Sequence, residues 1–460
     1  MRIAVVGSGI AGLSAAWLLS RQHEVDIYER ADYLGGHANT VDVELADRHL
    51  AVDTGFMVFN SRTYPNLLGL FDHLGVAAQK SRMSFSVQCG SEEIEWASNY
   101  LVGVFAQTGN VLRPEVWRML FDIFRLSLAA DRLLKDAEEA DEITLGHLLE
   151  REGYDGAFIR WYLLPMAASI WSTPTEKMLE FPAVNFLRFC ENHGLLHVTG
   201  KPRWQTVAGG AREYVRKIAT GISGHIHLNA EIIRVKRGPA AVELSVAGGG
   251  TQSYDQVVMA CHADQSLRLL ADASPAEVEL LGSFPYAAND VVLHLDDSFL
   301  PRHKRARASW NYHADECSLA TTGIAVTYDL TILQKLDAKQ PVMVTVNPPR
   351  AVDPDRVLRE FVYAHPGFDD AAIRSQARLA EIQGVQRTWY AGAWTRYGFH
   401  EDGLLSGMAV ARGFDIAAPW AVAPEPAPAP HAGAPQPIHG RVRTTSRGQG
   451  GAFRPEDAEG

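Results

Sequence analysis

Three glycines near the start of the chain, Gly7, Gly9 and Gly12, have the spacing of a turn that binds a dinucleotide. The first lets the chain turn sharply, the second lets backbone approach a pyrophosphate, and the third lets a helix pack closely on a strand. Glu29 stands where an acid would accept hydrogen bonds from a ribose diol. Free N–H groups and the positive dipole end of the helix would then hold the phosphates.

The surrounding sequence supplies the elements that this chemistry requires. The pattern predicts a buried parallel strand from Arg2 to Val6, a helix from Leu13 to Arg21 and a second strand from Val25 to Tyr28. A strand, a glycine turn, a helix and a strand in this order form a βαβ unit. The first 37 residues therefore predict a dinucleotide-binding unit rather than an accidental glycine-rich turn.

The residues after Glu29 favour FAD over NAD. Glu29-Arg30, followed after four residues by Gly35-Gly36, resembles the second signature of the FAD-dependent amine oxidase and phytoene desaturase superfamily. In that superfamily the paired glycines let the backbone run beside the flavin and the pyrophosphate. His37 stands where the superfamily usually has arginine. This departure leaves FAD as the expected cofactor and puts one phosphate contact in doubt.

Three later segments resemble further cofactor contacts of the same superfamily. A D-x-G segment that starts at Asp53 runs close to the flavin there, although an ordinary turn acid explains Asp53 equally well. Backbone near the position of Ile232 meets the adenine. A final motif of strand, glycine turn and helix, with the helix expected to begin near Asp402, faces the flavin and stabilises its anionic reduced form. The contacts that this motif implies are Asp402, Gly403 and Leu404.

A length of 460 residues exceeds one ordinary core, so two interleaved domains are expected. The expected fold class is α/β, with a Rossmann-like FAD-binding domain of the amine-oxidase type interleaved with an α+β substrate or cap domain. Residues 254–261 are predicted to be a buried strand that returns to the cofactor domain. The expected parts are cofactor domain at 1–64, 201–270 and 381–420, a mainly helical cap at 65–200, substrate domain at 271–380, and a disordered Pro/Ala-rich tail at 421–460.

Composition excludes several function classes. Forty-three basic against 54 acidic residues give a formal net charge of −11, so no nucleic-acid partner is expected. The four cysteines form no CxxC pair, and His193 and His197 lack the glutamate of an HExxH motif, so no metal site is expected. The first strand starts at Arg2 and no apolar run of about 18 residues occurs, so a cytoplasmic location is expected.

Two segments raise the question of peripheral contact with the inner face of the membrane. Residues 116–134 alternate apolar and basic side chains on a predicted helix, which favours a cap helix packed on its neighbours over a membrane-surface helix. Residues 301–307 contain the densest basic run of this acidic chain. Solvated loop charge and a site for an anionic headgroup or carboxylate explain that run equally well.

The segments ENHGLLHVTGKPRWQTVAGG, CHADQSLRLL and GAWTRYGFHEDGLLSG resemble one bacterial group of FAD-binding oxidoreductases. That group often accompanies methyltransferases of the cyclopropane-fatty-acid-synthase type. The resemblance implies dehydrogenation of a methyl-branched unsaturated fatty acyl chain, as in furan fatty acid formation, on a fatty acyl or phospholipid substrate. It also implies a functional partnership with an acyl-chain methyltransferase. Thr331 departs from the group, which has asparagine there.

The sequence leaves the reaction and its base open. His400, Glu401 and Tyr312 are catalytic candidates by their position near the last flavin motif or in the substrate domain. The alternative function is oxidation of a small soluble amine, for which Lys201 and Trp204 are the suggestive residues. A third hypothesis keeps the flavin only as a structural support for a partner enzyme. The electron acceptor also stays open between oxygen, a quinone and another acceptor. A built-in NAD(P)H site is not expected, because the chain has a single dinucleotide fingerprint.

Overall fold

The computed structural model describes residues 1–45, 48–139, 143–171, 175–192, 194–195, 202–317 and 325–420. His193, His197, Lys201 and the tail of residues 421–460 lie outside these ranges, so what the sequence predicts for them stays a prediction. No helix in the described ranges is long and apolar enough to cross a membrane.

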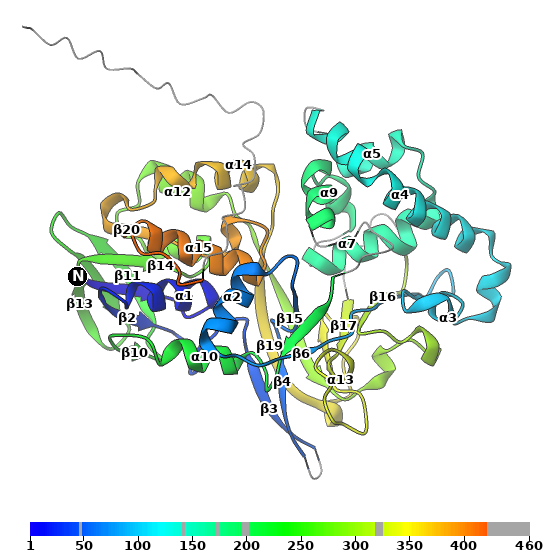
Figure 1. The fold of residues 1–460 in the computed structure, drawn as a ribbon, viewed down its shortest axis with the longest axis horizontal. Helices are drawn as coiled ribbons and strands as arrows, with labels where there is room; N and C mark the ends of the chain where they lie inside the picture. Colours follow the sequence, from blue (N-terminus) through cyan, green and yellow to red (C-terminus); the bar gives the residue numbers. More distant parts are fainter. Residues whose placement is uncertain are drawn as a thin grey trace, which may run out of the picture. The chain divides into compact units, whose positions relative to one another are not determined.

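A five-stranded parallel sheet begins with the N-terminal strand (Figure 1). Its order is β10-β2-β1-β14-β20, and every neighbouring pair is parallel. The strands are β1 (Arg2–Val6), β2 (Glu24–Tyr28), β10 (Ile226–His227), β14 (Gln256–Met259) and β20 (Thr388–Tyr390). Parallel neighbours need long crossover connections, so segments distant in sequence build this one sheet. The predicted strands at 2–6, 25–28 and 254–261 are confirmed, the last as β14.

Both faces of this sheet are buried under other elements. Alternate side chains of a strand point to opposite faces, so each strand contributes to two cores. Ile3 and Val5 of β1 join one core cluster, and Ala4 and Val6 join another. The first cluster is completed by α1 (Ile10–Leu19), α2 (Pro65–Leu74), α10 (Arg212–Ala219) and α15 (His400–Arg412). The second is completed by β11 (Ile232–Arg237), β12 (Val242–Val246), β13 (Gly250–Tyr254), α11 (Ala263–Leu269), α12 (Pro275–Gly282) and α14 (Asp370–Arg378).

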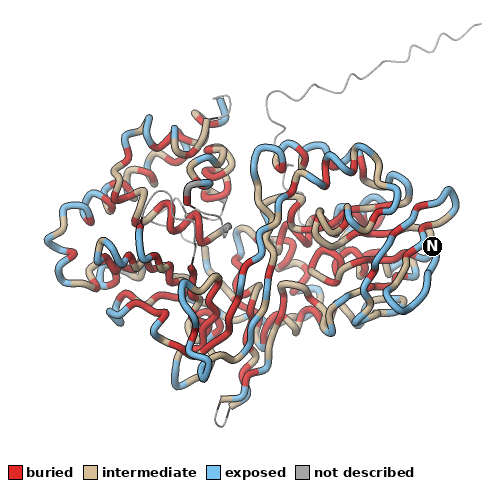
Figure 2. The backbone as a smooth tube through the Cα atoms, turned by 180° about the vertical axis from the view of Figure 1, so that it is seen from behind, coloured by how far each residue is buried: buried red, intermediate tan, exposed pale blue. Residues whose placement is uncertain are grey.

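A second, mostly antiparallel sheet has seven strands in the order β19-β15-β18-β17-β16-β7-β8. Only the β16–β7 pair is parallel. The strands are β7 (Phe85–Cys89), β8 (Ile94–Ala97), β15 (Tyr286–His294), β16 (Trp310–Ala314), β17 (Ala325–Asp329), β18 (Met343–Val346) and β19 (Val357–Pro366). The central strands of both sheets are buried along most of their length (Figure 2).

A helical layer packs on the β7–β16 side of the second sheet and has its own apolar core. Its elements are α3 (Tyr100–Val104), the 3₁₀ turn η1 (Thr108–Leu112), α4 (Pro114–Glu139), α5 (Leu145–Arg151), α6 (Gly156–Phe158), a π-helical turn (Ile159–Leu163), α7 (Leu164–Trp171), α8 (Thr175–Leu179) and α9 (Ala183–Asn192). The helix predicted at residues 116–134 is confirmed as part of α4.

Small elements connect the two sheets. They are the hairpin of β3 (Thr40–Leu45) and β4 (Arg48–Asp53), the three-stranded β5 (Phe59–Asn60), β9 (Trp204–Val207) and β6 (Ala78–Lys80), and the short α13 (Leu330–Leu333). Short 3₁₀ turns lie at Asp297–Phe299, Lys304–Ala306 (η4), Pro354–Arg356, Leu379–Glu381, Val385–Arg387 and Ala393–Thr395.

Three predicted boundaries are wrong. The first helix begins at Ile10 rather than Leu13, because the glycine turn itself enters the helix. The second flavin-motif helix begins at His400 rather than near Asp402. The segment 65–200, predicted to be mainly helical, contains strands β6, β7 and β8 between α2 and α3. Strands β6 and β7 pair with β9 and β16, which are distant in sequence, and β8 pairs with β7. Tertiary pairing of the first kind overrides local propensity.

Candidate flavin site

The glycine turn lies between the end of β1 and the start of α1. Gly7 has φ +103°, a conformation that favours glycine, and a β-carbon there would lie 2.8 Å from the Ala260 carbonyl oxygen. Gly9 precedes α1 without a side-chain cap, and a β-carbon at Gly9 would meet no atom within 4 Å. The first N–H groups of α1 have no intrahelical partner. Open space beside uncapped N–H groups is the arrangement that binds a phosphate.

The paired glycines of the second signature pack directly on this turn. Gly35 forms a β-bridge with Gly9, and its N–H donates to the Ser8 carbonyl oxygen at 3.0 Å. A β-carbon at Gly36 would lie 3.2 Å from the Cα atom of Gly9, and Gly36 has φ +58°. A β-carbon at Gly12 would overlap the Gly7 carbonyl oxygen. The structure therefore brings these five predicted glycines into one place, and at Gly7, Gly12 and Gly35 neighbouring backbone leaves no room for a β-carbon.

Glu29 follows β2 and lies beside the same turn. Its carboxylate accepts hydrogen bonds from the Ser8 N–H at 3.0 Å, the Ser8 hydroxyl at 2.7 Å and the Ala31 N–H at 2.9 Å. Arg30 is exposed next to it. The Ala230 N–H donates to the Glu29 carbonyl oxygen at 2.9 Å, which places the approach to Ile232 along this edge. Glu29, predicted to bind the ribose, and Ile232, predicted to lie near the adenine, are thus at the same end of the turn.

The N-terminus of α15 adjoins the N-terminus of α1. A β-carbon at Gly403 would lie 2.7 Å from Cγ2 of Ile10, and one at Gly407 would lie 2.6 Å from the Ala11 carbonyl oxygen. Both helices therefore begin at the same place, at the carboxyl edge of the parallel sheet. Two positive dipole ends at one edge favour a ligand with negative charge. Leu404 is fully buried in the core, so only its backbone can face a cofactor.

Asp402 lies in the first turn of α15 and is buried. One carboxylate oxygen accepts from the Phe399 N–H at 2.9 Å, and the other lies 3.4 Å from Nε of Arg396. Burial raises the pKa of Asp402 to about 7, although the Phe399 N–H and Arg396 oppose that shift. The predicted contact of Asp402 with cofactor hydroxyls stays a prediction.

His400 is the first residue of α15 and lies in an aromatic cluster. Its ring stacks on Phe56 at 3.7 Å between centroids and 8° between planes, and its Nε2 atom forms a 2.6 Å hydrogen bond with the Tyr214 hydroxyl. Burial, together with a smaller effect of neighbouring His37, lowers the pKa of His400 to about 3. His400 is therefore neutral at physiological pH.

His37 lies beside the second signature with a free ring nitrogen. Its Nε2 atom is buried and has no hydrogen-bond partner among the described residues. Its ring contacts those of Tyr363, at 4.9 Å, and His365, at 5.4 Å, both on β19. Burial lowers the pKa of His37 to about 3, with His365 and His262 acting in the same direction. A neutral His37 can offer one hydrogen bond but not the charge of the superfamily's arginine.

These features fit FAD. Gly9 and the N-terminus of α1 would hold the pyrophosphate, Glu29 the adenosine ribose, and the N-terminus of α15 the flavin. The buried, unpartnered Nε2 atom of His37 is accounted for if it faces the same cofactor. No group of three or more metal-ligating side chains occurs within the described ranges.

Two catalytic candidates have structural explanations. Glu401 is buried and accepts hydrogen bonds from the N–H groups of Asn66 and Leu67, at 2.8 and 2.9 Å, so it caps the N-terminus of α2. Tyr312 is buried on β16 in the apolar cluster with Val87 and Cys317. Burial raises the pKa of Tyr312 above its usual range. Neither geometry supports a role as base, which leaves His400 as the candidate beside α15.

Asp53 ties segments together instead of presenting a free carboxylate. It accepts hydrogen bonds from the Thr40 hydroxyl, the Ala211 N–H at 2.9 Å and the Gln334 side chain at 2.8 Å. Burial raises the pKa of Asp53 to about 7, against the opposing hydrogen bond from Thr40. A β-carbon at Gly55 would overlap the His37 carbonyl oxygen, so the D-x-G segment does run beside the second signature.

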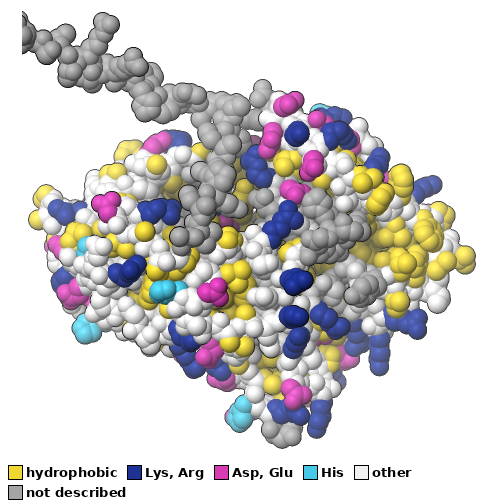
Figure 3. Space-filling view, viewed as in Figure 1, with side chains coloured by type: hydrophobic (Ala, Val, Ile, Leu, Met, Phe, Trp, Pro, Cys, Tyr) yellow, Lys and Arg dark blue, Asp and Glu magenta, His cyan; other side chains and the backbone are white. Residues whose placement is uncertain are grey.

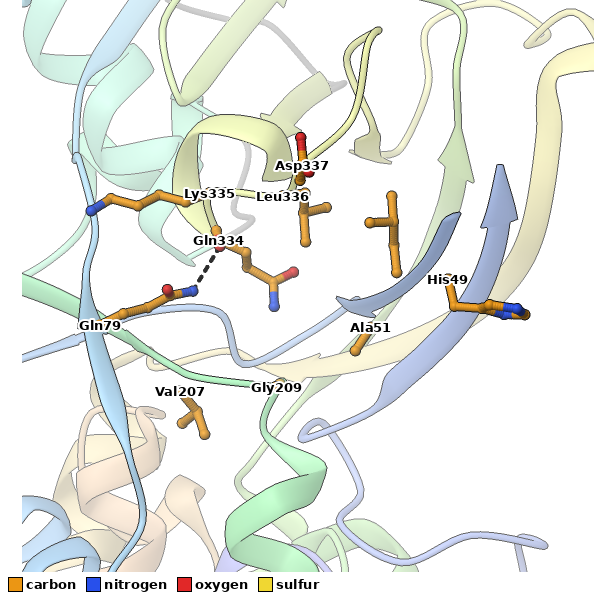
Figure 4. Close-up of a pocket in the computed structure, with 11 residues that line it drawn as sticks. His49, Ala51, Gln79, Val207, Gly209, Gln334, Lys335, Leu336 and Asp337 are labelled. Atoms are coloured by element: carbon orange, nitrogen blue, oxygen red, sulfur yellow. Dashed lines mark hydrogen bonds between the residues drawn. The ribbon is translucent and has the colours of Figure 1, made fainter. Parts of the chain in front are cut away.

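A surface pocket of about 190 Å³ lies between β4, β9 and α13 (Figure 4). Gln334, Leu336, Ala51 and Val207 line it, and Gln79 donates to the Gln334 carbonyl oxygen at 2.8 Å (Figure 4). It is smaller than the roughly 300–1,000 Å³ of common ligand pockets. None of the predicted cofactor residues lines it. This pocket is therefore separate from the flavin site.

Sequence reasoning missed several residues of the site. They are Ser8, Phe56, Tyr214, Tyr363 and Arg396. Phe56, Tyr214 and Tyr363 have partners that are distant in sequence. Ser8 lies within the glycine motif, so its place beside Glu29 could have been expected. No local pattern signals the stacking of Phe56 on His400.

Comparison with known proteins gives the chain its context. The family described as flavin containing amine oxidoreductase matches residues 10–413. A Mycobacterium tuberculosis protein named as a flavin-containing monoamine oxidase, AofH, is 25% identical over 389 residues, which cover 82% of this chain and 77% of that protein.

Two solved structures share the fold. The fatty acid isomerase from P. acnes that produces CLA has a TM-score of 0.62 at 16% identity, over 90% of this chain and 98% of that one. Putrescine oxidase bound to putrescine has a TM-score of 0.62 at 13% identity, over 90% of this chain and 99% of that one. Proteins of this fold thus include one named for a fatty acid and one named for an amine.

Proposed function

The chain belongs to the flavin containing amine oxidoreductase family and is a flavin-dependent oxidoreductase, and we propose that its substrate is a methyl-branched unsaturated fatty acyl chain, which it dehydrogenates. The substrate carbon beside the alkene would lose a hydride, and a neighbouring carbon would lose a proton, which leaves a conjugated diene. A methyl-branched alkene delocalises charge that develops at the allylic carbon. An unactivated alkane offers no such stabilisation.

FAD, when bound, supplies the hydride acceptor for this reaction. The chain's own residues would hold this cofactor. The N-termini of α1 and α15 meet at the carboxyl edge of the sheet, where they would stabilise negative charge on the cofactor. Within this proposal His400 stays the catalytic candidate, and the Tyr214 hydroxyl is the group that orients its Nε2 atom.

The stacked Phe56–His400 pair is the main observation that favours an apolar substrate. These rings lie at 3.7 Å beside the N-terminus of α15, and Tyr214 and Phe59 extend the aromatic surface. The nearest carboxylates, Glu401 and Asp402, are each engaged by backbone N–H groups. An apolar chain enters such surroundings without losing a charge–water interaction, whereas a protonated amine would lose one.

The fatty acid isomerase of the same fold supports this proposal, since its name shows that the fold accommodates an acyl chain. Putrescine oxidase and the mycobacterial relative support the alternative, a flavin amine oxidase that acts on a small soluble amine. Of the two residues suggested for that alternative, Trp204 lies on β9 opposite Asn60 and packs into two core clusters. Its indole is thus explained by packing.

Anaerobic mixing of the FAD-loaded protein with defined lipids tests the proposal. Methyl-branched unsaturated phospholipid in detergent should bleach the flavin absorbance, and a conjugated diene should appear in the chain. The straight-chain saturated analogue is the matched control and should leave the flavin oxidised. Bleaching by a simple amine but by no acyl lipid would overturn the proposal in favour of the amine oxidase. Flavin that no substrate reduces would instead favour a structural role for the cofactor.

A further inference from the structure

The long helix α4 has two apolar faces. One face is buried against the helical core through Val116, Met119, Leu126, Ala130 and Leu133. The opposite face exposes Trp117 (52%), Phe121 (65%), Phe124 (54%) and Leu128 (73%). Those four residues follow one another at intervals of four, three and four, which places them on one stripe of a helix. Burial in the core explains the first face and leaves the second unexplained.

The exposed stripe continues onto α3 and η1. Leu101 (70%) and Val102 (62%) of α3 and Val111 (47%) and Leu112 (85%) of η1 are also exposed. Trp117 connects the elements, since its Nε1 atom donates to the Val111 carbonyl oxygen at 2.9 Å. We call these eight residues the apolar face. Figure 3 shows hydrophobic side chains gathered over α3 and the start of α4, at the right edge of the view.

A basic segment borders the apolar face. The turn η4 packs against α3 and β8, and Glu95 of β8 fixes it by accepting from the N–H groups of Arg302 and His303, at 3.2 and 2.9 Å. The side chains of Arg302, Lys304 and Arg305 are exposed and form no ion pair with any described residue. We call these three residues the basic rim. Figure 3 shows Lys and Arg side chains below the apolar patch.

The arginines on α4 itself differ from the basic rim. Arg118 lies 3.9 Å from Asp155, Arg125 pairs with Asp122 at 3.0 Å, and Arg132 pairs with Glu152 at 2.6 Å. Acids of the chain itself therefore balance these charges. The basic rim, by contrast, forms no ion pair with any described residue and presents its positive charge next to the apolar face.

From this juxtaposition we infer that the apolar face and the basic rim together dock the protein on the surface of an anionic lipid bilayer. Aromatic and aliphatic side chains would enter the headgroup boundary, while the rim would contact lipid phosphates. An exposed indole is suited to that boundary, since one end is apolar and the other polar. No described helix can cross a bilayer, so α4 would lie along the surface.

Charge favours a bilayer over a second copy of the chain as the occupant. The chain carries a formal net charge of −11, so long-range repulsion opposes both self-association and approach to an anionic membrane through most of its surface. Positive charge at the edge of the apolar face reverses that repulsion locally. Two copies that met through this face would bring two basic rims together. An anionic membrane would instead complement the rim.

Co-sedimentation of the full-length, FAD-loaded protein with vesicles tests the inference. Vesicles of phosphatidylglycerol and phosphatidylcholine in equal parts should bind the protein more tightly than phosphatidylcholine alone, and added salt should remove the difference. The double variant Phe121→Ser/Phe124→Ser should lose binding to both vesicle types. The double variant Lys304→Glu/Arg305→Glu should lose at least about tenfold in affinity for the anionic vesicles only.

Matched variants elsewhere control for composition. Ile233→Ser/Val278→Ser removes two apolar side chains that are 56% and 52% exposed, and Arg234→Glu/Lys236→Glu reverses two exposed charges on β11. Neither should change vesicle binding. The inference would be overturned if the wild-type protein bound neither vesicle type. It would also be overturned if the variants of the apolar face and of the basic rim bound vesicles as well as these controls do.

Light scattering tests whether a second copy of the chain, rather than a bilayer, covers the apolar face. A dimer that Phe121→Ser/Phe124→Ser dissociates, without vesicle binding by the wild type, would show self-association and overturn the inference. The vesicle assay involves no turnover, so its result is independent of the proposed reaction. Reduction of the flavin by detergent-solubilised acyl lipid would stand even if the bilayer were not bound.

Discussion

Gly403 of α15 and Ile10 of α1 lie so close that a β-carbon at position 403 would be 2.7 Å from Cγ2 of Ile10. The contact recurs one turn later, where a β-carbon at Gly407 would lie 2.6 Å from the Ala11 carbonyl oxygen. Glycines four residues apart thus let two helices begin side by side. This approach creates the paired helix N-termini on which the flavin site depends.

Gly407→Ala should destabilise the fold, because the new methyl group would overlap backbone of α1 that cannot rotate away. Overpacking of this kind costs about 1–3 kcal/mol. We expect a lower thermal transition and weaker retention of FAD, measured by differential scanning fluorimetry and by flavin content. Gly282→Ala in α12 is the matched control, since its β-carbon would find ordinary contact at 3.7 Å from Leu267. Equal behaviour of the two variants would show that close helix approach is not required.

Gly9→Val should leave the fold intact and abolish the binding of FAD. A β-carbon at Gly9 meets no protein atom within 4 Å, and its φ of −64° suits any residue. The valine side chain would occupy the space proposed for the pyrophosphate. Purified variant should therefore be colourless, with a thermal transition close to that of the FAD-free wild type. Normal FAD content in this variant would contradict the proposed phosphate position.

The N-terminal half of the flavin site could be predicted from the sequence because it is local. Gly7, Gly9, Gly12 and Glu29 belong to one βαβ unit, and their spacing, together with the strands and helix around them, indicates their roles. The strands β6 and β7 were missed because their partners, β9 and β16, are distant in sequence. The capping role of Glu401 was missed for the same reason: its partner Leu67 lies 334 residues away. The position of Glu401 near a flavin motif suggests a catalytic role, and only the structure shows that its carboxylate caps α2.

Glu401→Gln tests that structural role directly. The amide would replace one acceptor oxygen by an N–H group that faces the N–H donors of Asn66 and Leu67. Loss of charge-assisted hydrogen bonds should lower the free energy of unfolding by about 1.5–3 kcal/mol. The rate of flavin reduction at saturating substrate should change less than about threefold. A rate that falls by orders of magnitude at unchanged stability would restore Glu401 as a catalytic residue.

Protonation of His400 should couple pH to stability. Burial lowers the pKa of His400 to about 3 in the folded protein, against an ordinary value of 6.5. Between these values the unfolded chain binds a proton that the folded chain does not, so this histidine makes the protein less stable as pH falls below about 6.5. Asp53 and Asp402 act in the opposite direction, because burial raises the pKa of each to about 7.

A variant isolates the histidine from those acids. His400→Gln keeps a hydrogen-bonding group for Tyr214 but cannot titrate. Moving from pH 7 to 5.5 should therefore cost the wild type about 1 kcal/mol more than the variant, by chemical denaturation with saturating FAD. The matched control is His49→Gln, whose wild-type side chain is 81% exposed and changes its surroundings little on folding. Parallel pH profiles for wild type and His400→Gln would mean that His400 is not held neutral in the folded protein.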